Sequence, residues 1–132
     1  MAYRFSARSQ DALDECDVRL QRVLAKAIEV VDFTVLEGHR GEARQNQMVA
    51  NGKSKLRWPN SKHNQSPSLA VDIAPYPIDW ANQHSQFQYL AGVVMGIAHE
   101  MGIDLRWGGD WDRDGQLSDN TFNDLPHFEV VE

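Results

Sequence analysis

The sequence holds a single cysteine, Cys16, among its 132 residues. One thiol excludes an internal disulfide, and it also excludes cysteine-rich zinc and iron-sulfur sites. A metal site in this chain would therefore have to use histidine and carboxylate ligands. Cys16 falls on the apolar stripe of an amphipathic segment, which favours a packed small hydrophobic side chain over a reactive nucleophile.

Long apolar runs are also missing. No stretch of the sequence approaches the roughly 20 apolar residues that a membrane-spanning helix needs. The N-terminal region is charged throughout and lacks both an apolar core and a small-residue cleavage pattern, so we expect no secretory signal and no membrane partner. These absences predict a soluble protein made in the cytosol, and we expect a monomer.

Positive charge is in deficit, because 13 Lys and Arg residues face 19 Asp and Glu residues, for a net charge of -6. This balance argues against a nucleic-acid partner held by bulk electrostatics. One segment nevertheless contains a local group of basic residues: Lys53, Lys55, Arg57 and Lys62. We favour a solvated loop over an anion-binding site for this segment.

Hydrophobic periodicity predicts the helices. Apolar residues recur at spacings of three and four from Ser9 to Val31, which predicts one long amphipathic helix capped by Ser9. The same pattern predicts a long helix over 84–102 that ends at Gly102, and a short helix over 41–52 that ends at Gly52.

Short alternating or apolar runs predict a strand that starts at Phe33 and ends at His39 and Arg40, and further strands over 69–74, 103–109 and 127–131. An irregular stretch over 53–68 is long enough to favour a functional loop. Neither a repeat nor a linker divides the chain. We therefore predict one α+β domain over residues 1–132, with an antiparallel or mixed sheet packed on helices.

One carboxylate interrupts an apolar strand. Alternation places Asp72 on the same face as Ala70 and Ala74, which leaves open space in front of it. His63 precedes this strand and His127 opens the last one. Two histidines and a carboxylate from separate elements match a hydrolytic zinc site, which keeps a fourth position for water. The alternatives are a solvent-facing acid and histidines that are partnered elsewhere.

Several motifs occur in the order of a known family: "EGHR", "SKH" followed by "AVDIAPY", "LRWGGDW" and "DLPHFEVV". With them the chain resembles the VanY-like zinc peptidases, and among these the single-domain bacteriophage endolysins that are L-alanyl-D-glutamate peptidases. The resemblance implies a Hedgehog/DD-peptidase-like fold. It also implies zinc-dependent hydrolysis of an amide bond in the peptidoglycan stem peptide, L-Ala-D-Glu, for host cell lysis.

The resemblance carries the zinc ligands onto His63, Asp72 and His127 and the catalytic acid/base carboxylate onto Asp124. It also matches Arg40 to an arginine that acts near the substrate. One departure concerns spacing: the family's interval between its first histidine and its aspartate is commonly shorter and contains a glycine, whereas "NQSPSLAV" intervenes here.

Residue chemistry alone leaves alternatives at both catalytic positions. Asp124 could be a turn residue before Pro126 rather than a proton carrier. Arg40 could bind a substrate carboxylate or stabilise an oxyanion, or it could form an ion pair with Glu37 or Glu42.

Two further polar residues flank the histidine ligands. Ser61 precedes His63 by two positions and Glu129 follows His127 by two, so both are candidates for orienting the imidazoles. A solvated side chain is the alternative for Glu129.

An acidic segment reproduces the first half of a calcium loop, D-x-D-x-D-G, with Asp110, Asp112, Asp114 and Gly115. Its twelfth position is Thr121 rather than a bidentate Glu, and no long helix precedes it. A calcium site and a solvated acidic turn both remain open.

Three functions are consistent with these residues. The favoured one is a phage endolysin that waits in the host cytoplasm until the membrane is permeabilised and then acts on peptidoglycan in the periplasm or cell wall. A D-alanyl-D-alanine carboxypeptidase is the alternative within the enzymes. A catalytically silent zinc-binding interaction module is the alternative of another class.

Overall fold

The computed structural model describes residues 3–81, 84–118 and 123–132. Within these ranges, four α-helices, one 3-10 turn and four strands form a single α+β arrangement, which confirms the predicted fold class. The helices are α1 (Ala7–Asp14), α2 (Val18–Ala27), α3 (Glu42–Ala50) and α4 (His84–Glu100), and the 3-10 turn is η1 (Lys62–Asn64). The strands are β1 (Phe33–Glu37), β2 (Ala70–Pro75), β3 (Leu105–Trp107) and β4 (His127–Val130).

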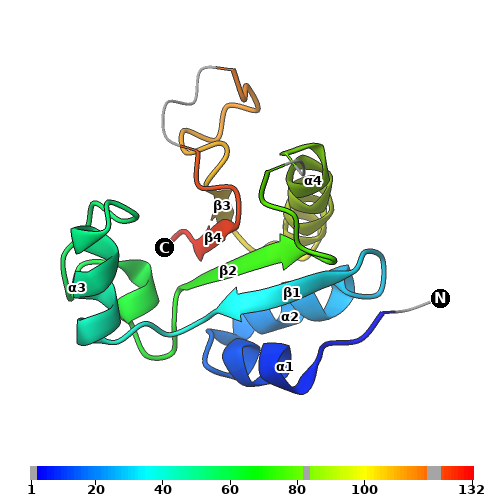
Figure 1. The fold of residues 1–132 in the computed structure, drawn as a ribbon. Coiled ribbons are helices and arrows are strands. Elements are labelled where there is room, and N and C mark those ends of the chain that lie inside the picture. Colours follow the sequence, from blue (N-terminus) through cyan, green and yellow to red (C-terminus); the bar gives the residue numbers. More distant parts are fainter. Residues whose placement is uncertain (1–2, 82–83, 119–122) are drawn as a thin grey trace.

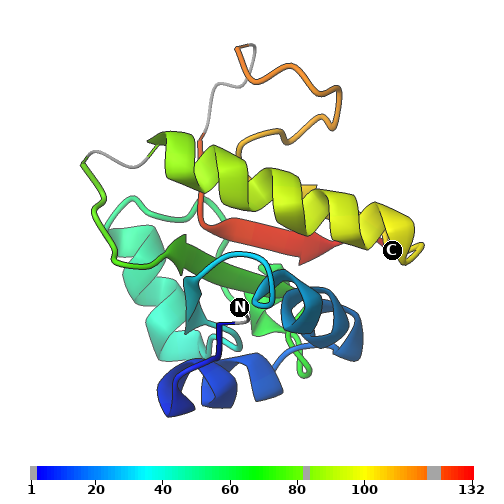
Figure 2. The same ribbon diagram turned by 90° about the vertical axis from the view of Figure 1, so that its right-hand side faces the viewer.

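The strands form one antiparallel sheet in the order β1-β2-β4-β3 (Figure 1). Helices α2 and α4 pack against each other and against one face of this sheet, where the core lies (Figure 2). Helix α3 lies on the opposite side of the molecule from α4 (Figure 1). Within the described ranges, no helix has the length and apolar character needed to cross a membrane.

The N-terminal helix differs from its prediction. Instead of one helix starting at Ser9, the structure has α1 capped by Ser6 and α2 capped by Asp17, with a break between them. The Asp17 carboxylate accepts the Arg19 N–H, which starts a new helix where apolar periodicity alone would continue the old one.

The break between α1 and α2 also holds the loop that precedes β2. Asp17 donates its backbone N–H to the carbonyl of Ser68 (2.8 Å), and Ser68 donates its own to the carbonyl of Glu15 (2.9 Å). Cys16 is buried here as predicted, and burial raises the pKa of its thiol to about 12. A thiol with so high a pKa is protonated at neutral pH and is a poor nucleophile.

A bulge changes the end of β1. Simple alternation places Glu37 on the core-facing side with Phe33 and Val35, but the register shifts after Val35 and sets Glu37 opposite Asp72. Opposite residues of an antiparallel pair share a face of the sheet. The bulge therefore brings the Glu37 carboxylate to the face that carries Asp72, as bulges near functional sites often do.

Candidate active site

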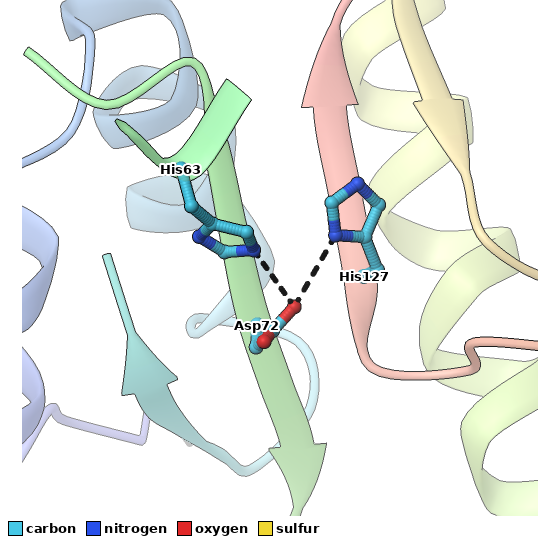
Figure 3. Close-up of side chains that lie close together, drawn as sticks. All are labelled: His63, Asp72 and His127. Atoms are coloured by element: carbon cyan, nitrogen blue, oxygen red, sulfur yellow. Dashed lines mark ion pairs between the residues drawn. The ribbon is translucent and has the colours of Figure 1, made fainter. Parts of the chain in front are cut away.

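Three elements bring the predicted metal ligands together (Figure 3). His63 comes from η1, Asp72 from β2 and His127 from the start of β4, where it lies opposite Asp72 in the sheet. Asp72 Oδ1 lies 3.3 Å from His63 Nε2 and 3.4 Å from His127 Nδ1. One ligand atom from each residue lies within 4.8 Å of the others, so the structure contains a candidate metal site.

Two of these ligand atoms are buried without a hydrogen-bond partner, namely His63 Nε2 and Asp72 Oδ1. Burying an unpaired polar atom costs roughly 1–3 kcal/mol, so such atoms require an explanation. A cation bound between the three side chains would supply the missing partner. Two imidazole nitrogens and a carboxylate oxygen are the donor set that fits zinc when no thiolate is present.

The far nitrogen of each imidazole is held by another group. His63 Nδ1 lies 2.8 Å from the carbonyl oxygen of Gly38, and His127 Nε2 lies 2.8 Å from Glu129 Oε1. Both partners are acceptors, so in the neutral rings each far nitrogen donates a proton and the lone pair of the near nitrogen faces Asp72. Glu129 thus contacts the His127 imidazole, whereas Ser61 accepts the backbone N–H of His63 and caps η1.

Gly38 is a site residue that sequence reasoning missed. Its carbonyl orients His63, and its Cα packs so tightly against α1 that a Cβ would lie 2.4 Å from the carbonyl oxygen of Ala12. Only glycine fits this approach, because a backbone atom cannot move aside as a flexible side chain can.

Replacing Gly38 with alanine is expected to lower the free energy of unfolding by about 1–3 kcal/mol through overpacking against α1. Urea unfolding of the metal-free protein measures this change. Gly92→Ala is the matched control, because Gly92 is exposed in α4 and a Cβ added there would meet nothing within 4 Å. The free energy of unfolding of this control should rise by about 0.5–1 kcal/mol. A Gly38→Ala protein as stable as the wild type would contradict the close contact between Gly38 and α1.

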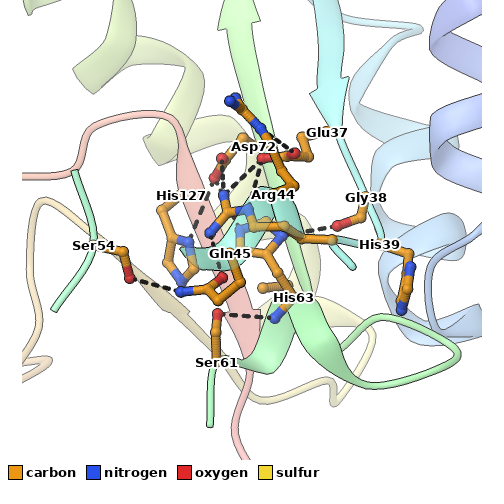
Figure 4. A network of polar contacts seen from close by, with 12 residues as sticks. Glu37, Gly38, His39, Arg44, Gln45, Ser54, Ser61, His63, Asp72 and His127 are labelled. Carbon is orange, nitrogen blue, oxygen red and sulfur yellow. Dashed lines mark hydrogen bonds and ion pairs between the residues drawn. The ribbon is translucent and has the colours of Figure 1, made fainter. Parts of the chain in front are cut away.

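Arg40 is buried, with 4% of its side chain exposed, and its donors are already in use. It forms an ion pair with Glu37 (2.7 Å), donates to Gln45 Oε1 (3.0 Å) and lies 3.4 Å from Asp72 Oδ2. Figure 4 shows Glu37, Gln45 and Asp72 within this network. The Glu37 ion pair that the sequence left as an alternative is therefore observed, and Arg40 holds the Asp72 oxygen that faces away from the histidines.

Gln45 completes the network and was also missed. It is fully buried in α3, and its amide group bonds Arg40, Asn64 and Ser54. An isolated glutamine in a polar helix gives no signal in the sequence that it will be buried.

The charges of the site shift its pKa values. Burial raises the pKa of Asp72, but His63 and His127 outweigh burial and hold it well below its usual range. Burial lowers the pKa of His127, but its contacts with Asp72 and Glu129 outweigh burial and raise it to about 9. Asp72 is therefore a carboxylate at neutral pH, and a metal ion would have to displace a proton from His127.

Asp124 lies beside the ligands, with its Oδ2 atom 4.0 Å from His127 Nδ1 and 34% of its side chain exposed. Burial and the charge of Asp72 raise the pKa of its carboxyl group. Asp124 donates its N–H to the carbonyl of Gly108 (2.9 Å), and a Cβ on Gly108 would lie 2.0 Å from the Asp124 carbonyl oxygen. Gly108 therefore allows the turn that places Asp124 next to His127.

A cleft of about 1090 Å³ opens in front of these residues. The irregular stretch predicted as a functional loop forms one wall with Lys53, Lys55 and Lys62, and Trp80 and Trp111 also line the cleft. The space is large enough for a peptide of several residues.

The acidic segment after β3 gathers Asp110, Asp112 and Asp114 into a second group of carboxylates. Its oxygens accept backbone N–H groups within the same loop, those of Asp114, Gly115 and Gln116. Thr121 lies outside the described residues. The calcium site stays a prediction, with the solvated turn as its alternative.

Comparison with a solved structure defines the class of protein. The fold matches the crystal structure of the Serratia marcescens L-Ala D-Glu endopeptidase ChiX with a TM-score of 0.78 and 33% sequence identity, covering 98% of this chain and 91% of that chain. The fold is therefore that of a small peptidase domain.

Two sequence comparisons then identify the family. The L-alanyl-D-glutamate peptidase of Escherichia phage T5 is 36% identical over 139 residues, covering 99% of this chain and 100% of that protein. A family model described as phage L-alanyl-D-glutamate peptidase matches residues 1–131, and the chain belongs to that family. The predicted resemblance and the prediction of an enzyme are confirmed.

Proposed function

We propose that the protein is a zinc-dependent peptidoglycan endopeptidase that hydrolyses the L-Ala-D-Glu bond of the stem peptide during host cell lysis. The observation that carries the proposal is the convergence of His63, Asp72 and His127 with two buried ligand atoms unpartnered. Membership of the family and the names of its relatives support the choice of bond. In this proposal a monomer waits in the host cytoplasm and reaches the cell wall once the membrane is permeabilised.

His63, Asp72 and His127 would hold the zinc ion. When bound, zinc supplies a Lewis acid that polarises a carbonyl group and makes water acidic enough to ionise near neutral pH. The chain fixes the geometry around this position through the Gly38 carbonyl and Glu129, which orient the imidazoles, and through Arg40, which holds the second oxygen of Asp72.

We assign proton transfer to Asp124. Its carboxylate lies in the cleft next to His127, close enough to take a proton from an attacking water and to return it to the nitrogen of the departing amine. Its raised pKa suits this role, because a carboxylate whose pKa is higher is a stronger base. Arg40 acts in this proposal by positioning Asp72, since its own donors are bound within the protein.

Digestion of purified peptidoglycan by the zinc-loaded protein tests the proposed function. Mass spectrometry of the products is expected to show new C-terminal L-alanine and new N-terminal D-glutamate, and chelation of zinc should abolish both. Released D-alanine would identify a carboxypeptidase instead. No new termini in wall material from several bacterial types would favour the silent zinc-binding module.

A further inference from the structure

Arg106 lies in the middle of β3, on the face of the sheet that carries the site. It is opposite Glu129 of β4, and Asp72 and His127 are opposite each other on the neighbouring strand pair. Because opposite residues in antiparallel strands share a face, Arg106 points to the side of Glu129 and His127. It lines the same cleft as Asp124.

The guanidinium of Arg106 has no acceptor among the residues that the structure describes, and its Nε atom is buried without a hydrogen-bond partner. The carboxylate nearest to it in the sheet is already bound, because Glu129 Oε1 lies 2.8 Å from His127 and Oε2 lies 3.3 Å from Lys62. A buried N–H without an acceptor is costly, and a partly buried cation is more so. This cost would be offset by an anionic ligand in the cleft.

The other cations beside the catalytic centre differ from Arg106 in this respect. Arg40 and Arg44 both bind Glu37, and Lys62 binds Glu129. These side chains neutralise acidic groups of the protein itself. Arg106 is therefore the better placed of these cations to receive an acidic group from a substrate.

The proposed substrate carries such a group next to the bond that is cut. A glutamate residue has two carboxyl groups, and only one of them can continue the peptide, so the other remains a carboxylate close to the scissile amide. We propose that Arg106 is a specificity residue that binds this free carboxylate of the glutamate, an inference that rests on the proposed function. The planar guanidinium can donate two parallel hydrogen bonds to a carboxylate, which a lysine cannot do.

Two matched peptides test this assignment. One is N-acetyl-L-alanyl-D-glutamyl-L-lysine in which lysine is attached to the glutamate side chain, leaving the α-carboxylate free. The other has the α-carboxylate replaced by a carboxamide of the same shape. The zinc-loaded wild type is expected to prefer the acid peptide by about 10- to 100-fold in kcat/KM, the range for loss of a charge-assisted hydrogen bond.

The variants then assign the preference to one side chain. In Arg106→Ala the ratio of kcat/KM for the acid peptide to kcat/KM for the amide peptide should fall to near one. In Arg106→Lys this ratio should lie between one and the wild-type ratio, because lysine keeps the charge but lacks the planar guanidinium. Arg22→Ala is the control, because Arg22 is exposed on α2 and lies outside the cleft, and it should keep the wild-type ratio. Thermal unfolding of each variant checks that it folds.

Three results would overturn the assignment in distinguishable ways. A wild type that cuts both peptides equally well rejects a carboxylate subsite and leaves the proposed function intact, even if no variant folds. An Arg106→Ala protein with the wild-type ratio moves the subsite to another residue. A wild type that cuts neither peptide rejects the proposed function, and the role of Arg106 falls with it.

Discussion

Replacing Asp124 with asparagine is expected to lower kcat/KM about 100- to 10,000-fold while the zinc content stays that of the wild type. Asparagine keeps the size of the side chain and the backbone bond to Gly108, but its amide cannot accept and return a proton at neutral pH. Hydrolysis of the acid peptide and metal analysis of the same sample measure the two properties together.

The pH profile separates proton transfer from a structural role of Asp124. A base must be ionised, so wild-type activity should fall as the pH drops through the raised pKa of Asp124, above the ordinary value of 3.8. The residual activity of Asp124→Asn should lack that acid limb. Asp11→Asn, an exposed substitution in α1, is the control. Full activity in Asp124→Asn would remove this residue from the mechanism.

Replacing His63 with alanine is expected to abolish both zinc binding and hydrolysis. The substitution removes one of three ligands and leaves the buried Asp72 Oδ1 with one neighbouring imidazole in place of two. Mass spectrometry of metals should find one zinc ion per wild-type chain and almost none in the variant after dialysis. Undiminished zinc content would refute the ligand set.

Stability provides a second measurement of the same variant. A ligand that binds only the folded state stabilises it by about 4 kcal/mol at a free concentration 1,000 times its dissociation constant. Zinc should therefore raise the thermal unfolding midpoint of the wild type and leave that of His63→Ala unchanged. His99→Ala, at the exposed end of α4, should respond to zinc as the wild type does.

Most of the fold followed from local patterns in the sequence. The alternating run at β1, the apolar runs at β2 and β4 and the long stripe of α4 all overlap the segments that periodicity predicted, because each contributes apolar side chains to the common core. The first strand ends at Glu37, two residues before the predicted end at His39 and Arg40. The break between α1 and α2 did not follow, because apolar residues continue across it. It depends on the Asp17 cap and on pairing with Ser68, which is distant in the sequence.

The site was predictable where side chains carry the chemistry. His63, Asp72 and His127 each lie in a short motif that resembles a motif of the family, and this resemblance selected them as candidate ligands. Gly38 acts through its carbonyl, a group that every residue possesses, so no residue type could reveal it. Arg106 needed the structure for another reason: only a three-dimensional arrangement shows that an arginine lacks an acceptor.

The chain between His63 and Asp72 is held at separate points along its length. His63 is fixed through its ring by Gly38 and through its carbonyl by the Arg40 N–H (2.7 Å), Ser68 is fixed to the α1–α2 break, and Asp72 is fixed by the sheet. Each ligand therefore has contacts of its own outside the intervening segment. Extra residues between these anchors can loop outward without moving the ligands. Searches for further relatives should accordingly allow a variable gap between histidine and aspartate instead of a constant one.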